Sequence, residues 1–321
     1  MDFDQPGNNL QNGRKSNTLN GVLSRANGVF EFVQRLWISC VRTVHGREFL
    51  AEMFATFMLV TMGNGAVAQV ILGATASTFD FGSQLSINLG YGLGGMIGAF
   101  IAGGVTGAHM NPAVTLAMAL RGKLNWLKVI PYWFAQLLGA FLSAAMIYWV
   151  YYDALMAVNC HGYGQKSVNC TAGIWASYPQ PYLSLGTGFM DQFFGTFLLL
   201  LGIFGITDVN NNEAKQGMKP VLVGLLITAI GLSYGLNCGY AINPARDFAP
   251  RLFTAIAGWG WDVFVCEECA HIRQWWWVPV VAPLVGAATA SLVYWLFIEV
   301  LHPKSTTKKN EEQGYTPVQT D

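Results

Sequence analysis

Six apolar stretches of membrane-spanning length constrain the fold of this chain more than any other feature. A helix needs roughly 17–25 mainly apolar residues to cross a bilayer. The chain is 53% hydrophobic and only 11% charged, whereas soluble domains carry about a quarter charged residues. The sequence therefore predicts an all-α membrane protein with six transmembrane helices. The expected spans cover residues 48–71, 86–105, 125–151, 188–207, 217–237 and 275–301.

The basic residues gather on one side of these spans. Six spans place both termini on the same side, and most of the 18 lysines and arginines lie in the two tails and in the connections at 121–128 and 208–219. The positive-inside rule makes that side cytoplasmic. The polar start shows no signal-peptide pattern, so we expect the first span to insert uncleaved. The formal net charge of +0 gives no reason to expect a nucleic-acid partner.

The two halves of the chain resemble each other. "ATFML" (55–59) matches "GTFLL" (195–199), and "AQLLGA" (135–140) matches "APLVGA" (282–287). Two further apolar segments, at about 112–122 and 244–256, are too short to span, and each begins with Asn-Pro-Ala. Each half therefore has three spans and one re-entrant half-helix. Because three is odd, the second copy must be inserted upside down, as an inverted repeat.

This repeat divides the chain into a channel domain and two tails. Residues 30–44 put apolar side chains on one helical face, which fits either an interfacial helix on the inner leaflet or an amphipathic helix docked on the bundle. The expected divisions are a cytoplasmic N-terminal tail at 1–46, a channel domain at 47–302 with repeats at about 47–153 and 187–302, and a cytoplasmic C-terminal tail at 303–321.

The duplicated Asn-Pro-Ala motifs carry the chemistry. Asparagine is a strong helix N-cap and proline is favoured at the first helical position. Two such helix starts can meet near the bilayer midplane, where their positive dipole ends repel cations. Polar backbone at this depth must be buried in protein or line a cavity, so a pore is expected, although two ordinary caps in loops are the alternative. The motifs are Asn111, Pro112 and Ala113 in the first half, and Asn243, Pro244 and Ala245 in the second.

One ionisable residue stands in the first turn of the second short helix. Arg246 is expensive in lipid and must face protein or water. It could be a fixed cation at a pore constriction that donates hydrogen bonds to a polar solute. The alternative is a salt bridge with Asp247 or Asp191.

The segments "TGAHMNPAVT" and "GYAINPARDFAPRLFTAIAGWG" resemble the aquaporins, or major intrinsic proteins. The aspartate that follows Arg246, Asp247, is a feature in which the chain resembles the glycerol-conducting branch of this family, the aquaglyceroporins. The resemblance runs from about Arg47 to His302, and "REFLAE" and "WWWVPVVAPL" are similar to the animal aquaporin seven subgroup. It implies an aquaporin-like right-handed bundle that assembles as a homotetramer with one pore per subunit in the plasma membrane.

The resemblance also implies an outer selectivity filter formed by Tyr91, Gly231, Tyr240 and Arg246. Water-selective relatives have a histidine where Gly231 stands, so glycine is expected to leave room for a polyol. The family more often has phenylalanine or tryptophan at position 91. The extra hydroxyl of Tyr91 therefore bears on the width and polarity of the filter.

Further site residues are carried over from the family by position. A ladder of pore carbonyls is implied at Gly107, Ala108, His109, Met110, Gly239 and Ala241, with the His109 side chain in a structural role. Structural support of the re-entrant segments is implied for Glu52, its repeat mate Gln192, Asp247 and Arg251.

Four cysteines, Cys160, Cys170, Cys266 and Cys269, lie outside on this topology and could form up to two disulfides in any of three pairings. Cys40 is inside and should be reduced. Cys238 near the filter could make the pore mercurial-sensitive, or it could simply be a small wall residue. Asn169 opens an Asn-Cys-Thr glycosylation sequon in an outer loop.

The sequence shows no nucleophile with a base, no phosphate-binding loop and no cofactor motif. The segment "CEEC" (266–269) is poor evidence for zinc, so no enzyme, cofactor or metal is expected. We expect a passive channel for glycerol, water and urea that excludes ions and protons. A secondary transporter with inverted repeats is one alternative. A water-selective or junctional member of the same fold is another.

Overall fold

The computed structural model describes residues 31–32, 34–35, 38, 44–77, 79–158, 160, 164–265 and 274–302. It divides into two compact units, Met1–Glu48 and Phe49–Asp321. In the first unit, the described residues at 31–32, 34–35 and 38 are helical, as predicted for residues 30–44, and exposed Arg35 lies 3.7 Å from Glu31. The other residues of that predicted helix, up to 43, and Cys40 lie outside the described part.

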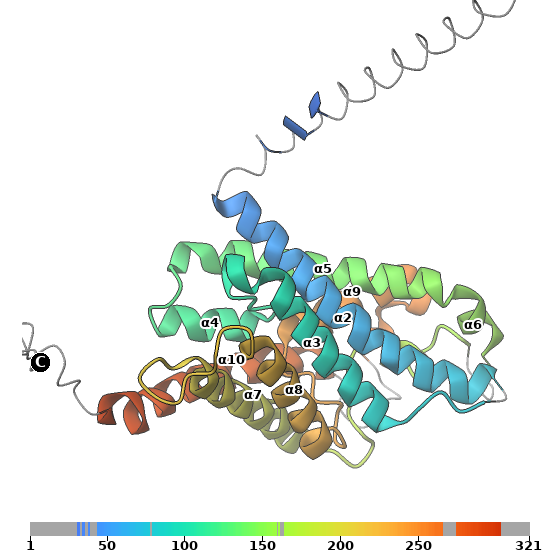
Figure 1. The fold of residues 1–321 in the computed structure, drawn as a ribbon. Coiled ribbons are helices and arrows are strands. Elements are labelled where there is room, and N and C mark those ends of the chain that lie inside the picture. Colours follow the sequence, from blue (N-terminus) through green and yellow to red (C-terminus); the bar gives the residue numbers. More distant parts are fainter. Residues whose placement is uncertain are drawn as a thin grey trace, which may run out of the picture. The chain divides into compact units, whose positions relative to one another are not determined.

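The described residues form helices and no strands (Figure 1). The longer helices are α2 (Val44–Ala76), α3 (Gln84–Thr106), α4 (Pro112–Leu120), α5 (Val129–Val150), α6 (Tyr152–Ala157), α7 (Leu185–Thr207), α8 (Lys219–Tyr234), α9 (Pro244–Thr254) and α10 (Val278–Phe297). Single-turn pieces are η1 (Trp126–Lys128), η2 (Ala172–Ile174), η3 (Ala255–Trp259), η4 (Trp261–Val263), η5 (Trp275–Trp277) and η6 (Glu299–Leu301).

Five described helical stretches are long and apolar enough to cross a membrane: His45–Ala74, Gln84–Thr106, Trp126–Val150, Leu185–Thr207 and Trp275–Leu301. The span predicted at 217–237 is shorter than expected, because α8 has 16 residues. At 1.5 Å per residue it is about 24 Å long, less than the roughly 30 Å of a bilayer core. It ends at Tyr234, where the chain turns into the segment that leads to the second Asn-Pro-Ala.

The order of elements repeats. Two long helices, one short helix and one long helix occur first as α2, α3, α4 and α5, and again as α7, α8, α9 and α10, with α8 as the shortened member. The short helices have 9 and 11 residues, and each begins at the proline of Asn-Pro-Ala behind an asparagine N-cap. The two under-length segments are therefore half-helices, as predicted.

The halves interlock in the second unit. Helix α5 packs against α9 of the other half, α10 packs against α4, and α3 packs against α8. Gly139 and Gly286 occupy matching positions, and a Cβ at either one would collide with the carbonyl of Met53 or Phe193, respectively. The same close helix contact is thus made once in each half, because glycine lets the backbones approach.

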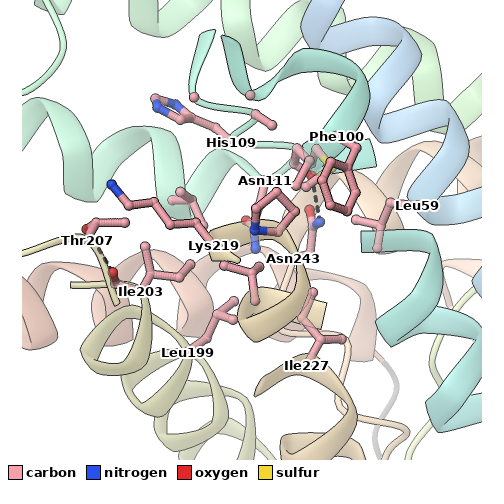
Figure 2. Close-up of a pocket in the computed structure, with 18 of the residues that line it drawn as sticks. Leu59, Phe100, His109, Asn111, Leu199, Ile203, Thr207, Lys219, Ile227 and Asn243 are labelled. Carbon is pink, nitrogen blue, oxygen red and sulfur yellow. Dashed lines mark hydrogen bonds between the residues drawn. The ribbon is translucent and has the colours of Figure 1, made fainter. Parts of the chain in front are cut away.

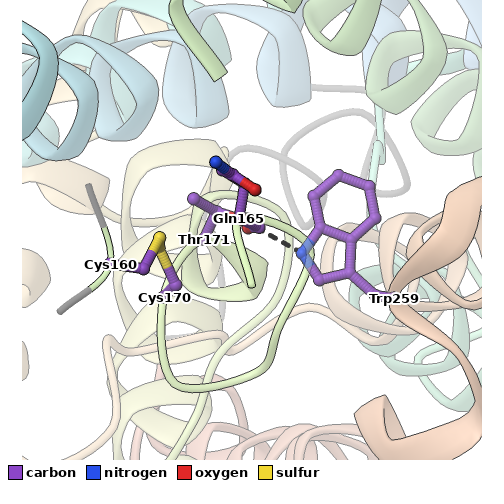
Figure 3. The surroundings of a disulfide bond; sticks show 5 residues. All are labelled: Cys160, Gln165, Cys170, Thr171 and Trp259. Atoms are coloured by element: carbon purple, nitrogen blue, oxygen red, sulfur yellow. Dashed lines mark hydrogen bonds between the residues drawn. A yellow bond between two sulfur atoms is a disulfide. The ribbon is translucent and has the colours of Figure 1, made fainter. Parts of the chain in front are cut away.

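A disulfide between Cys160 and Cys170 closes the loop after α6 (Figure 3). The Trp259 indole donates a hydrogen bond of 3.0 Å to the hydroxyl of Thr171, next to the disulfide. This pairing selects one of the three that the sequence allows. Cys266 and Cys269 lie outside the described residues.

Candidate functional site

A cavity of about 850 Å³ runs between the two half-helices. Its lining follows α8 from Lys219 through Val223 to Ile227, and continues to the predicted filter. Figure 2 shows Asn111 and Asn243 together in this cavity. Apolar side chains of α7 and α8 face it beside polar groups of the re-entrant segments. The cavity therefore offers an apolar wall and a row of hydrogen-bonding groups to anything that enters.

At its centre the two Asn-Pro-Ala motifs brace each other. The Asn111 amide donates to the carbonyl of Ile242 at 2.9 Å, and the Asn243 amide donates to the carbonyl of Met110 at 2.8 Å. The side-chain oxygens accept from their own helix starts: that of Asn111 from Ala113 N at 2.8 Å, and that of Asn243 likewise. Each amide keeps one N–H beyond these bonds. Apart from one further bond, which Asn243 accepts from Arg246 N at 3.2 Å, the junction is symmetric in its hydrogen bonds.

The segments before each motif share an unusual backbone. Ala108 and Met110 have φ values of 52°, and Tyr240 and Ile242 have φ values of 37° and 42°. These pairs are repeat mates, and their left-handed conformation is costly for non-glycine residues. Strain of this kind is typical of functional segments.

The predicted carbonyl residues take different places. The cavity lining includes Gly107, Ala108, His109, Met110 and Ala241, but not Gly239. The Met110 carbonyl already accepts from Asn243, so the ladder has one fewer free acceptor site than predicted. The side chain of His109 is 9% exposed, and its Nδ1 lies 3.2 Å from the Thr115 hydroxyl.

Glu52 holds the first re-entrant segment in place. Its carboxylate is fully buried and accepts four hydrogen bonds. The backbone N–H groups of His109 and Met110 donate at 2.9 and 2.8 Å, and Thr106 and Gln136 donate at 2.6 and 2.8 Å. This geometry fits the supporting role predicted for Glu52, because each oxygen is fixed by two donors.

Gln192 holds the second segment in the equivalent way. Its side-chain oxygen accepts from the N–H of Ile242 at 2.9 Å, and Ile242 is the repeat mate of Met110. Its amide donates to Cys238 Sγ at 3.0 Å and to Asp191 at 3.2 Å. Asp191 also accepts from Asn237 at 2.8 Å. Cys238 is the free cysteine of the described residues and is buried in this network.

Three of the four predicted filter residues line the cavity together: Tyr91, Tyr240 and Arg246. The guanidinium carbon of Arg246 lies 4.8 Å from the centre of the Tyr91 ring. The Tyr91 and Tyr240 rings meet edge to face at 6.0 Å. Within the described part of the chain, Arg246 Nη1 and the Tyr240 hydroxyl are buried and have no hydrogen-bond partner. Such groups are suited to receive a polar solute.

Gly231 does not open space into the lumen, contrary to the steric argument from the sequence. A Cβ there would lie 2.5 Å from Tyr240 Cζ and 2.7 Å from both the Tyr240 hydroxyl and Asn88 Oδ1. The room that glycine leaves is filled by Tyr240. Gly231 therefore sets the position of the Tyr240 ring.

Behind the filter, Asp247 and Arg251 form a buried ion pair. Arg251 donates two bonds to one Asp247 oxygen, at 3.1 and 2.9 Å. Ser177 donates its N–H at 2.7 Å and its hydroxyl at 2.5 Å to the other. Arg251 also donates to the carbonyls of Val263 and Ser177 at 2.7 and 2.5 Å. Arg246 Nη1 lies 3.8 Å from Asp247 Oδ2, so the ion pair with Asp247 that the sequence offered as an alternative is present, but it is too long for a hydrogen bond.

Two pairs of ionisable groups lie near the other end of the cavity: Lys219 and Glu213, which line it, and Asp208 and His302, which line a second cavity that shares residues with it. Lys219 lies 2.5 Å from Glu213. Asp208 accepts hydrogen bonds of 2.9 Å from Tyr294 and His302. Burial alone would raise the pKa of the Asp208 carboxyl, but the hydrogen bonds, led by that of His302, outweigh burial and lower the pKa below its ordinary value.

Sequence reasoning missed several residues of this site. Asn64, Gln136 and Ser177 are each buried and hydrogen-bonded to a predicted site residue. For Asn64 and Gln136, the available signal was that a lone polar residue in an apolar span must find a partner, whereas Ser177 lies in a loop and carries no such signal. No motif marked which partner that would be. No cluster of His, Cys, Asp or Glu able to hold a metal occurs among the residues that the structure covers.

Comparison with known proteins identifies the family to which the chain belongs. The family described as "Major intrinsic protein" matches residues 40–294. The chain is 45% identical to aquaporin-9 of Homo sapiens over 88% of this chain and 92% of that protein. It is 42% identical to aquaporin-7 of Mus musculus over 84% of this chain and 85% of that protein, so the likeness is not confined to the aquaporin seven subgroup.

A solved structure agrees with these sequence matches. The X-ray structure of the aquaglyceroporin from Plasmodium falciparum superimposes with a TM-score of 0.69 and 31% identity, over 80% of this chain and 98% of that one. The duplicated half-helices and the family match together establish that this chain belongs to the major intrinsic protein family, with an aquaporin fold.

Proposed function

We propose that this protein is a passive channel that conducts glycerol and water and excludes ions and protons. The observation that carries the proposal is the cavity between the half-helices, with an apolar wall opposite hydrogen-bonding groups. A polyol has a carbon side and a hydroxyl side, and such a lining can hold both without a deep binding site. The similarity to an aquaglyceroporin supports this solute class.

The same geometry accounts for ion exclusion. The N-termini of α4 and α9 meet at Asn111 and Asn243, and Arg246 adds a full positive charge close by. Helix N-termini carry partial positive charge. A cation, including an excess proton on a file of water, would meet an electrostatic barrier there.

The buried carboxylates that could couple transport to an ion are already hydrogen-bonded within the protein. Glu52, Asp191 and Asp247 each accept several hydrogen bonds from neighbouring residues. None of the three lines the cavity. This arrangement favours a channel over the secondary transporter, which needs exchangeable intramembrane charges.

The finer points of the proposal come from family resemblance and topology. Urea is included as a solute, since it is small, neutral and a strong hydrogen-bonding partner. A homotetramer in the plasma membrane fits the exposed apolar side chains outside the cavity, such as Phe134 and Phe194, and cytoplasmic termini fit the positive-inside rule. The Asn-Pro-Ala junction is proposed as the central barrier and the ring of Tyr91, Tyr240 and Arg246 as the outer filter. Cross-linking in native membranes tests the tetramer.

Stopped-flow permeability in proteoliposomes tests the function. We expect water, glycerol and urea fluxes well above those of empty liposomes, with no change when Na⁺ or proton gradients are imposed. Flux that follows an ion gradient would establish the transporter. Water flux without glycerol flux would establish the water-selective alternative, and neither flux from correctly inserted protein would favour a junctional role.

A further inference from the structure

The hydroxyl of Tyr91 does not face the pore. It donates a hydrogen bond to the side-chain oxygen of Asn64, on the neighbouring helix α2. Asn64 is fully buried and Tyr91 is 4% exposed. Tyr91 lines the cavity, whereas Asn64 is absent from the lining. What Tyr91 presents to a solute is therefore its ring, and the polar end is turned back into the protein.

Asn64 is itself held from behind. Its amide donates a 3.0 Å hydrogen bond to the carbonyl of Trp175. Trp175 is 1% exposed, and its indole meets that of Trp259 edge to face with ring centres 4.8 Å apart. Trp259 in turn donates to Thr171 beside the disulfide (Figure 3). Asn64 thus links Tyr91 to the disulfide-closed loop.

The Tyr91 ring is also confined on its other sides. A Cβ at Gly63 would collide with the ring, so glycine allows it to lie against the backbone of α2. Arg246 lies over one face and Tyr240 meets its edge. The phenolic oxygen moves only with the ring, so its hydrogen bond to Asn64 is the contact that fixes the tilt of the Tyr91 ring.

We propose that Asn64 is a specificity-determining residue of this channel, acting as a positioning residue through Tyr91. This inference rests on the proposed passage of glycerol. Without the acceptor, the buried hydroxyl has no partner, which is unfavourable, and the ring must tilt to bring the hydroxyl to Arg246 or to water in the lumen. Either movement narrows the filter and adds a polar group to it. Glycerol, which is wider than water, loses the most.

The test is a double-mutant cycle of Asn64→Leu and Tyr91→Phe, read as the ratio of glycerol to water permeability in proteoliposomes. The ratio does not depend on how much protein inserts. We expect Asn64→Leu to lower it by about threefold to tenfold, the scale of small changes in a recognition site. Tyr91→Phe should lower the ratio less than Asn64→Leu does, because the hydroxyl that it removes does not meet solute, and its ratio is the reference for the double variant.

The double variant decides between positioning and mere packing. Removing both partners of a buried hydrogen bond is far milder than removing one, so Asn64→Leu with Tyr91→Phe should restore the ratio of Tyr91→Phe. Thr61→Val is the matched control, because Thr61 makes a 2.9 Å hydrogen bond from the same helix to Ser143, and neither residue lines the cavity. It should leave the ratio unchanged.

Several outcomes would overturn the inference: an unchanged ratio in Asn64→Leu, no rescue in the double variant, or a change in Tyr91→Phe as large as in Asn64→Leu. If Asn64→Leu does not insert, Tyr91→Phe alone decides, and a shift of threefold or more would place the hydroxyl in the lumen. Wild-type protein that conducts no glycerol would instead overturn the proposed function.

Discussion

The filter accommodates the Tyr240 ring because residue 231 has no Cβ. The three atoms nearest to an added Cβ all lie within 2.7 Å, and two belong to Tyr240. We therefore expect Gly231→Ala to displace Tyr240 into the lumen and to lower glycerol permeability by about tenfold, with Gly231→His lower still. Stopped-flow measurement on proteoliposomes with matched protein content checks this.

Gly103→Ala provides the control for that substitution. Gly103 lines the cavity, but nothing lies within 4 Å of a Cβ added there. Its glycerol permeability should match that of wild type. Equal behaviour of the two alanine variants would show that Tyr240 moves aside without entering the path of the solute.

The buried charge of Glu52 is stabilised by the hydrogen-bond donors around its carboxylate. A glutamine there would turn one acceptor oxygen into a donor facing other donors, so Glu52→Gln should lower the free energy of unfolding by about 2–4 kcal/mol. Thermal unfolding in detergent measures it. Glu213→Gln, the same change in a partly exposed ion pair with Lys219, should cost less than about 1 kcal/mol. A similar effect of both would refute the assigned support.

How much of the site the sequence predicts depends on whether a residue is repeated. Asn111 and Asn243 can be identified from the sequence because their motif recurs, and Glu52 because it is a charged residue in an apolar span. Asn64 has no mate and no charge, and its partner depends on how α2 is rotated against α3. That rotation follows from packing over the whole bundle, which local sequence does not specify.

At the scale of elements, the two re-entrant segments store strain at matching positions. A left-handed conformation costs a non-glycine residue about 1–2 kcal/mol, and Ala108 is such a residue. Ala108→Gly should relieve it, offset by the greater freedom of glycine in the unfolded chain, for a net gain of up to about 1 kcal/mol. Unfolding in detergent reports the change.

Ala117→Gly is the matching change in regular helix. Ala117 is fully buried in α4, where glycine costs about 1 kcal/mol. The two alanine-to-glycine changes should therefore have opposite signs. If Ala108→Gly destabilises as much as Ala117→Gly, the left-handed backbone is not strained in the folded protein.

The elements themselves are predicted well because length and polarity decide them. All the expected spans correspond to helices, and both half-helices begin where Asn-Pro-Ala predicts. The exception is α8, which ends early because its chain must bend into the second re-entrant segment. Sequence shows how apolar a stretch is, but a tertiary requirement determines where the helix stops.

At the scale of the whole molecule, the orientation of the protein in the membrane can be measured at the loop between α6 and α7. Asn169 is exposed in that loop, so a glycan attached there could remain on the folded protein. If the topology is as predicted, the loop faces the lumen of the endoplasmic reticulum during synthesis, and the sequon can be modified there. Loss of a glycosidase-sensitive gel shift in Asn169→Gln would fix both the site and the orientation.

The fold also predicts that this modification competes with disulfide formation. Thr171 of the sequon is fully buried and bonded to Trp259, and Cys170 is joined to Cys160. Glycosylation must therefore precede closure of the loop, and occupancy in wild type should be partial. Cys160→Ser leaves the Asn-Cys-Thr sequon intact but prevents closure, so the glycosylated fraction should rise. If the glycosylated fraction instead falls or stays the same, folding of the loop does not limit access to Asn169. If wild type and Cys160→Ser both lack a glycan, the predicted orientation loses its support.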